Sequence, residues 1–136
     1  MCGRVAPEPS DLARPFWDGC NAGLLLIQRC LTCGMFIHQP EPECIGCGGT
    51  SLTFEAVGGT GRVETFTVIH RSFVPNYRDA VPYVVGWIAL PEQRNLRIFS
   101  AIVGPESVER VAMDAAVEVR FENVVGFGAI PVFELV

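Results

Sequence analysis

The 136-residue sequence contains no lysine, so all ten of its basic residues are arginines. Without lysine, the chain cannot form a Schiff base through an ε-amine, nor build a Walker-type phosphate loop. Its 15 acidic residues bring the formal net charge to −5. Proteins that bind nucleic acid electrostatically need an excess of positive charge on at least one face, so the composition argues against that class.

Long apolar runs are also missing from the sequence. The longest candidate, residues 24–27, has the length of a strand and falls far short of the ~20 residues of a membrane span. The first residues do not form the basic segment followed by an apolar segment that marks a secretory signal. We therefore expect a cytoplasmic protein with no membrane contact.

Four of the six cysteines form two C-x-x-C pairs, Cys30 with Cys33 and Cys44 with Cys47. A disulfide framework is the alternative, but paired C-x-x-C spacing in a chain without an export signal favours metal. Four thiolates complete a tetrahedral zinc shell and leave no position for water or substrate. The spacing therefore predicts a structural zinc ion, with His38 as a loop residue between the pairs.

Glycine and proline positions divide the chain into three segments. Residues 1–23 should form a loose leader and a helix over 12–21, capped by Ser10 and Asp11 and bearing an apolar stripe. Residues 24–57 should form a zinc ribbon, and Gly58 to Gly61 should mark its boundary with a β-rich domain over 58–136.

The β-rich segment shows five strand patterns, over 62–70, 83–90, 96–103, 116–122 and 130–136. A short helix is expected between the third and fourth, from Gly104 to about Met113. Five strands with one helix in this position follow the order of an OB-fold barrel. The predicted fold is thus mainly β: an N-terminal helix, a four-cysteine zinc ribbon and a C-terminal five-stranded OB-fold barrel.

The ordered motifs resemble one known family, over about residues 14–122. The residues that carry the resemblance are Phe16-Trp17, Gly23-Leu24, Gln28-Arg29-Cys30-x-x-Cys33-Gly34, Cys44-x-x-Cys47-Gly48, Gly59-x-Gly61-x-Val63, Thr65-Phe66-Thr67-Val68-Ile69-His70 and Pro82-Tyr83-Val84-Val85. This family combines a rubredoxin-like zinc ribbon with an OB-fold, was formerly catalogued as a domain of unknown function, and is associated with acyl-CoA chemistry.

Two loops depart from the family pattern. Many relatives have Phe-Pro-Pro before the second cysteine pair, whereas this chain has Phe36-Ile37-His38-Gln39-Pro40. The usual glycine-containing turn before the fourth barrel strand is replaced by Met113-Asp114-Ala115. Both changes fall in loops, so they affect local geometry rather than the family resemblance.

The resemblance implies a non-catalytic accessory subunit. Family members look like companions of thiolase-superfamily enzymes or of lipid-transfer-protein-like aldolases, including those of steroid side-chain degradation. The partner carries the carbon–carbon chemistry, while the small protein stabilises it and helps form an acyl-CoA channel. Thiolytic or retro-aldol cleavage of a steroid side-chain or aromatic acyl-CoA would both fit this role.

The chain's own reactive residues do not form a recognisable catalytic set. Cys2 falls in the leader, Cys20 falls on the apolar helix face, and His70 ends a strand beside Arg71. An activated cysteine needs a lowered pKa and a base within reach, and the sequence places no such partner near these residues. We expect the reactive groups to belong to another chain.

Nine Phe, two Trp and two Tyr are many aromatics for a ribbon and a small barrel. Some should lie on the surface and contact a partner or an acyl-CoA. The candidate contact residues are Phe16, Trp17, His70, Arg71, Phe73, Tyr77 and Tyr83. Two alternatives remain: a single-stranded nucleic-acid-binding module, because both folds serve that purpose, and a zinc or thiol enzyme in its own right.

Overall fold

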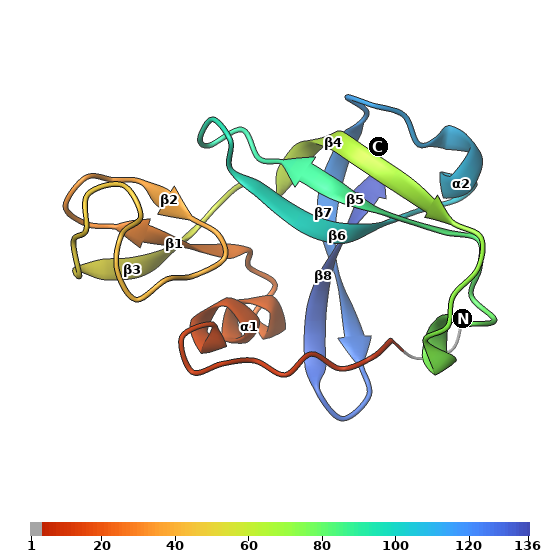
Figure 1. Cartoon of the computed structure of the whole chain (residues 1–136), viewed down its shortest axis with the longest axis horizontal. Coiled ribbons are helices and arrows are strands. Elements are labelled where there is room, and N and C mark those ends of the chain that lie inside the picture. Colours follow the sequence, from red (N-terminus) through yellow and green to blue (C-terminus); the bar gives the residue numbers. More distant parts are fainter. Residues whose placement is uncertain (1–3) are drawn as a thin grey trace.

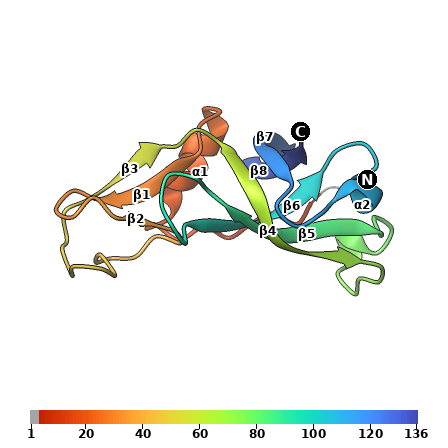
Figure 2. The same cartoon turned by 90° about the horizontal axis from the view of Figure 1, so that it is seen from above.

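The computed structural model describes residues 4–136 and confirms the mainly β architecture. A helix, α1 (Arg14–Asn21), precedes a small sheet of β1 (Leu26–Cys30), β2 (Phe36–Ile37) and β3 (Leu52–Ala56). The remaining elements are β4 (Thr60–Ile69), the 3-10 helix η1 (Pro75–Tyr77), β5 (Tyr83–Ala89), β6 (Arg97–Val103), α2 (Ser107–Arg110), β7 (Ala116–Val124) and β8 (Gly128–Leu135). In Figures 1 and 2 the small sheet lies at one end of the molecule and the barrel at the other.

Helix α1 begins at Arg14 rather than at residue 12, because the segment before it forms a separate turn. The Ala13 backbone N–H donates to the Ser10 hydroxyl at 3.2 Å and lies close to the Ser10 carbonyl at 3.1 Å. Ser10 therefore caps this turn, and Ala13 occupies the helix N-cap position without a side-chain cap. Pro15 fits the first helical turn, where its missing N–H costs nothing.

The ribbon sheet has the order β2-β1-β3, with both pairs antiparallel. Strand β1 is central and pairs along its full length with β3, from Leu26 opposite Ala56 to Cys30 opposite Leu52. Strand β2 is only two residues long. The sheet thus delivers the first cysteine at the end of its central strand.

The barrel is closed in the order β4-β5-β6-β8-β7. Antiparallel pairs join most neighbours, while β6 and β8 run parallel, with Ile102 opposite Phe133. Closure between β4 and β7 places Gly61 opposite Val117. This strand order, with one short helix between the third and fourth barrel strands, is that of an OB-fold.

Helix α2 is a single turn that ends at Arg110, so the expectation of a helix reaching Met113 was wrong. Val111 is extended, and Asp114 adopts a left-handed conformation with φ of 66°. The Asp114 N–H then donates to the Val63 carbonyl at 2.7 Å, and the Val63 N–H donates to the Ala115 carbonyl at 3.0 Å. Pairing with β4 therefore replaces the last helical turn, and Asp114 adopts the left-handed conformation that the turn requires.

One hydrophobic core joins the helix, the ribbon and the barrel. Phe16 and Cys20 of α1 and Ile27 of β1 pack in the same buried cluster as barrel residues such as Ile88 and Phe133. A second, small cluster lies under the cysteine pairs and contains Cys30, Ile37 and Cys44. The ribbon therefore has little core of its own and depends on the metal and on the barrel.

Gln93, in the turn between β5 and β6, joins the barrel to ribbon strand β2. The Phe36 backbone N–H donates to Gln93 Oε1 at 2.8 Å, and Gln93 Nε2 donates to the Phe36 carbonyl at 2.9 Å. The side-chain amide thus pairs with Phe36 as a neighbouring strand would. Glu92 adds a further bond by accepting from the Gly58 N–H at 2.9 Å.

None of the helices in the described part of the chain has the length and hydrophobicity needed to span a membrane.

Candidate metal centre and ligand groove

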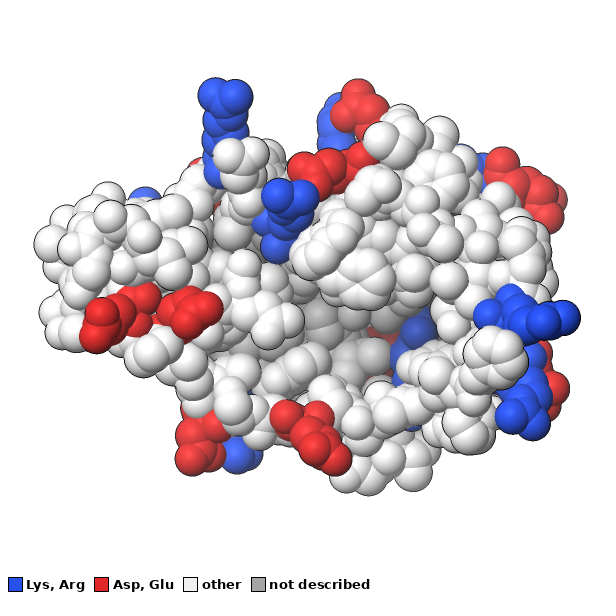
Figure 3. Space-filling view, in the orientation of Figure 1, with Lys and Arg blue, Asp and Glu red and all other residues white. Residues whose placement is uncertain are grey.

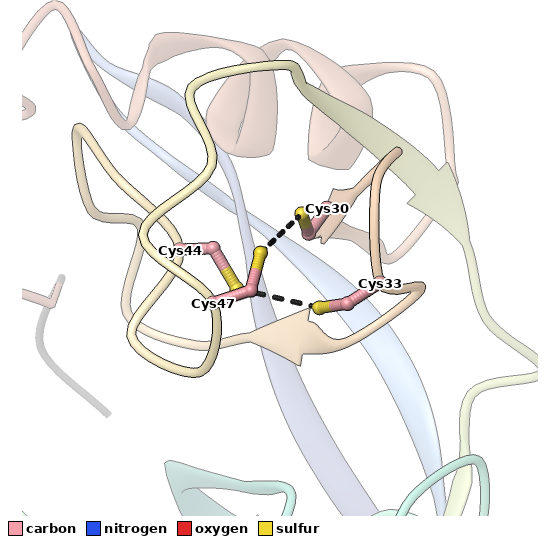
Figure 4. Close-up of side chains that lie close together, drawn as sticks. All are labelled: Cys30, Cys33, Cys44 and Cys47. Atoms are coloured by element: carbon pink, nitrogen blue, oxygen red, sulfur yellow. Dashed lines mark hydrogen bonds between the residues drawn. The ribbon is translucent and has the colours of Figure 1, made fainter.

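The four paired cysteines converge on one point. Cys30 ends β1, Cys33 follows it in a tight turn, and Cys44 and Cys47 come from the loop before β3 (Figure 4). All four Sγ atoms lie within 4.8 Å of one another, with Cys30 and Cys47 at 3.7 Å and Cys33 and Cys44 at 3.6 Å. A tetrahedron with Zn–S bonds of ~2.3 Å has sulfur–sulfur edges of about 3.8 Å. The observed spacing fits a zinc ion.

Backbone N–H groups prepare two of these sulfurs to bind as thiolates. The Cys33 and Thr32 N–H groups lower the pKa of Cys30 to about 6, and the Cys47 and Gly46 N–H groups lower the pKa of Cys44. The Gly49 N–H favours the Cys47 thiolate in the same way, but the neighbouring sulfurs outweigh it and raise the pKa of Cys47 to about 11. Four thiolates this close repel one another, and a bound divalent cation removes that repulsion.

A groove of about 620 Å³ lies between the ribbon and the barrel. Its walls are the N-terminal segment 4–13, helix α1, residues 38–40 of the ribbon loop, the segment with Val74 and Tyr77, and strands β5, β6 and β8. Figure 3 shows a hollow at the centre of the molecule, lined mainly by uncharged atoms. On this face arginine and acidic side chains are interspersed around the hollow, and no extended basic patch is visible.

The candidate contact residues separate into two groups. Phe16, Trp17, Tyr77 and Tyr83 line the groove. Phe16 is only 4% exposed and packs in the core, so it is not available on the outer surface. His70, Arg71 and Phe73 do not line the groove; they are exposed on the segment between β4 and η1, and Phe73 is 81% exposed.

Aromatic contacts hold the groove residues of α1 in place. Trp17 meets Phe16 edge to face at 4.9 Å between ring centroids and Phe127 at 5.5 Å. Asn21 Oδ1 accepts from the Ala129 N–H at 2.8 Å, which ties the end of α1 to β8. On the opposite side of the groove, Tyr77 packs against Tyr83 at 5.6 Å. Packed aromatic side chains therefore flank the groove on both sides.

His38 lies in the groove wall, where the sequence predicted only a loop residue. Its ring stacks obliquely on Phe16 at 5.3 Å between centroids, and its Nδ1 is buried without a hydrogen-bond partner. Burial lowers the pKa of His38 to about 4, so the imidazole is neutral at physiological pH. The cluster that could hold a metal consists of the four paired cysteines.

The thiol of Cys20 belongs to neither the metal cluster nor the groove lining. Cys20 is 1% exposed in the core, and burial raises its pKa to about 11, so it remains a thiol. Cys2 lies outside the described residues.

Several groove residues were missed by the sequence reasoning. Val85 and Phe99 line the groove from the outer faces of β5 and β6, and Trp87 and Phe99 form an exposed edge-to-face pair at 5.2 Å. The sequence of β5 could have indicated this surface. Its outward-facing positions Tyr83, Val85 and Trp87 are apolar, whereas a strand face in contact with water usually carries polar residues. Arg4 and Val5 gave no such signal.

Comparison with protein families matches both parts of the chain. Residues 17–53 match the rubredoxin-like zinc ribbon domain of ChsH2, and residues 54–122 match the ChsH2 C-terminal OB-fold domain. A curated relative, the probable enoyl-CoA hydratase alpha subunit of Thermomonospora curvata, is 32% identical over 107 residues. The match covers 77% of this chain but only 33% of that relative, so the chain spans about a third of its length.

Solved structures show the same architecture. A chain of the Ltp2-ChsH2(DUF35) aldolase has a TM-score of 0.84 and 26% identity, covering 95% of this chain and 98% of that one. A DUF35-family protein of unknown function from Sulfolobus solfataricus has a TM-score of 0.66 and 15% identity, covering 93% and 87%, and supports the fold alone. With its four-cysteine structural zinc site and closed five-stranded barrel, the chain belongs to the ChsH2 family of zinc-ribbon and OB-fold proteins.

Proposed function

We propose that this protein is a non-catalytic accessory subunit that binds and stabilises a thiolase-like enzyme acting on acyl-CoA and helps form its acyl-CoA channel. The main support is the likeness to a chain of the Ltp2-ChsH2(DUF35) aldolase over 95% of this protein, at a TM-score of 0.84. The likeness extends through helix, ribbon and barrel together, as expected if the whole molecule serves one docking role.

The name of the curated relative supports the choice of substrate. A probable enoyl-CoA hydratase alpha subunit would act on an acyl-CoA as one part of an assembly. Retro-aldol or thiolytic cleavage of a steroid side-chain or aromatic acyl-CoA is the corresponding reaction that we propose for the partner of this chain. The acyl-CoA would be shared between the two subunits.

Exposed aromatic residues supply a candidate docking surface. Phe73 is 81% exposed in the segment between β4 and η1, beside Val74 at 44%. Trp87 and Phe99 add a second exposed pair on the outer face of β5 and β6, at 39% and 54%. Large apolar side chains at such positions are typical of protein interfaces. His70 and Arg71 lie in the same exposed segment as Phe73 and would contact the partner or the acyl-CoA.

Co-expression with a thiolase-superfamily protein from the same organism tests this proposal. We expect the two proteins to co-purify in a fixed stoichiometry, the complex to cleave acyl-CoA esters, and the small subunit alone to show no turnover. Phe73→Asp should weaken the complex, whereas Val125→Asp, at an equally open apolar position (91% exposed) in the β7–β8 turn, is the matched control. If the small subunit stays monomeric and the large one is fully active alone, the proposal is wrong.

A further inference from the structure

The groove has the dimensions of a small-molecule site formed by this chain alone. Its volume of about 620 Å³ falls in the range of about 300–1,000 Å³ that is usual for ligand pockets. It is concave, and its sides come from the N-terminal segment, helix α1, the ribbon loop, the segment around Tyr77 and the barrel. The N-terminal side is held in place because the Val5 N–H donates to the Tyr77 hydroxyl at 3.2 Å.

The lining carries almost no available charge. Among the described residues of the lining, Arg4 and Glu8 are the only ionisable ones apart from His38 and the two tyrosines. The Arg4 Nε donates to Glu122 Oε1 at 2.9 Å, and both side chains are largely buried, so this cation is already neutralised. A phosphate or carboxylate would find no unpaired cation among these residues. The chemistry of the lining therefore favours an uncharged, mainly apolar ligand.

His38 supplies a directed polar group within this apolar lining. Its Nδ1 is the His38 nitrogen that is both buried and without a hydrogen-bond partner. A buried N–H without a partner is less tolerable than a buried acceptor without one, so the proton of the neutral ring belongs on Nε2. Because His38 is one of the lining residues, we infer that this N–H is available to a molecule in the groove.

We propose that the groove binds an uncharged, predominantly apolar small molecule and that the Nε2–H of His38 donates a hydrogen bond to an oxygen of that molecule. Binding of this kind needs no partner protein. Identifying the ligand with the acyl portion of a CoA ester rests on the proposed accessory function, whereas the site itself does not.

A neutral naphthyl ketone, 6-propionyl-2-(dimethylamino)naphthalene, is a suitable probe because its emission reports both polarity and hydrogen bonding to its ketone. We expect saturable binding to the full zinc-loaded chain, with blue-shifted emission. Ala101→Phe should fill the groove and weaken binding at least tenfold, because Ala101 lines it from β6. Ala116→Phe, the same change at an exposed barrel position outside the lining, should bind like the wild type.

His38→Phe tests the donor, since phenylalanine keeps a ring at this position and removes the N–H. Loss of one neutral hydrogen bond should weaken probe binding about fivefold. The emission of the bound probe should also shift further to the blue, because its ketone loses a hydrogen bond. Unchanged affinity and emission in His38→Phe would refute the role of His38.

Co-purification of the same variants with the thiolase-superfamily protein separates the two proposals. Equal probe binding by Ala101→Phe and Ala116→Phe, or no saturable binding at all, overturns the groove site. If Ala101→Phe abolishes co-purification and the wild type does not bind the probe, a protein partner fills the groove and the accessory function stands. If the wild type and the Ala101→Phe and Ala116→Phe variants bind the probe as expected but the proteins do not co-purify, the groove site is supported and the accessory function is contradicted.

Discussion

The amide of Gln93 should contribute more to stability than any other side chain in its turn. It accepts from the Phe36 N–H and donates to the Phe36 carbonyl, at 2.8 and 2.9 Å. Phe36 itself is 6% exposed. Gln93→Ala would leave both of these backbone groups without a partner in a place that water reaches poorly.

The magnitude follows from these two groups. A polar group that loses its partner costs about 1–2 kcal/mol when its hydrogen bond is only partly buried, as both are here. We therefore expect Gln93→Ala to lower the free energy of unfolding by about 2–4 kcal/mol, a large share of the ~5–15 kcal/mol of a typical domain. With a urea m-value of about 2 kcal/mol/M, the unfolding midpoint should fall by about 1–2 M.

Equilibrium urea unfolding of the zinc-loaded protein, followed by tryptophan fluorescence, measures this loss. Arg94→Ala is the control, because Arg94 is exposed in the same turn and makes no hydrogen bond among the described residues. Its effect should stay within about 0.5 kcal/mol. If the Gln93 and Arg94 variants unfold at the same urea concentration, the proposed connection between barrel and ribbon is refuted.

Three further predictions concern the metal and the buried titratable groups. Cys33→Ser, or removal of zinc by a chelator, should unfold the ribbon. Circular dichroism should then show a loss of β signal, and atomic absorption should find no stoichiometric zinc. An unchanged fold without metal would contradict a structural site. Because the folded pKa of His38 is lowered to about 4, the unfolded state takes up protons first, and stability should fall by up to about 3 kcal/mol as the pH drops from about 6.5 towards 4. His38→Phe should lack this pH-dependent loss of stability, although both proteins would release zinc in acid alike. Identical stability–pH profiles for the variant and the wild type would refute the assignment to His38. Cys20, with a pKa of about 11, should resist iodoacetamide at pH 8 in the native protein and react after unfolding; fast native labelling at this residue would show that it is not buried.

The metal site and the barrel could be predicted because both depend on local patterns. Two C-x-x-C pairs define a thiolate set by their spacing alone, and the alternation Val117, Val119 and Phe121 defines a strand face. The strand order of an OB-fold then follows from the number of strands and the position of the one helix. These features need no knowledge of which distant residues meet.

The groove could not be predicted, because its walls come from residues far apart in the sequence. Arg4 meets Glu122, and His38 lies beside Phe16, only after the helix and ribbon pack against the barrel. The early end of α2 likewise depends on a contact between residues that are far apart in the sequence. Its sequence favours a longer helix, but backbone pairing with Val63 supplies hydrogen bonds that the final turn would otherwise have made.

The position of residues 38–40 between the two cysteine pairs has a consequence for how the molecule matures. Zinc closes this segment into a ring, and ring closure removes most of the freedom of the residues inside it. Residues 38–40 form one wall of the groove, and this wall takes its shape when the metal closes the ring. Zinc availability in the cell would thus affect how tightly the groove binds its ligand, although none of the four cysteines lines the groove.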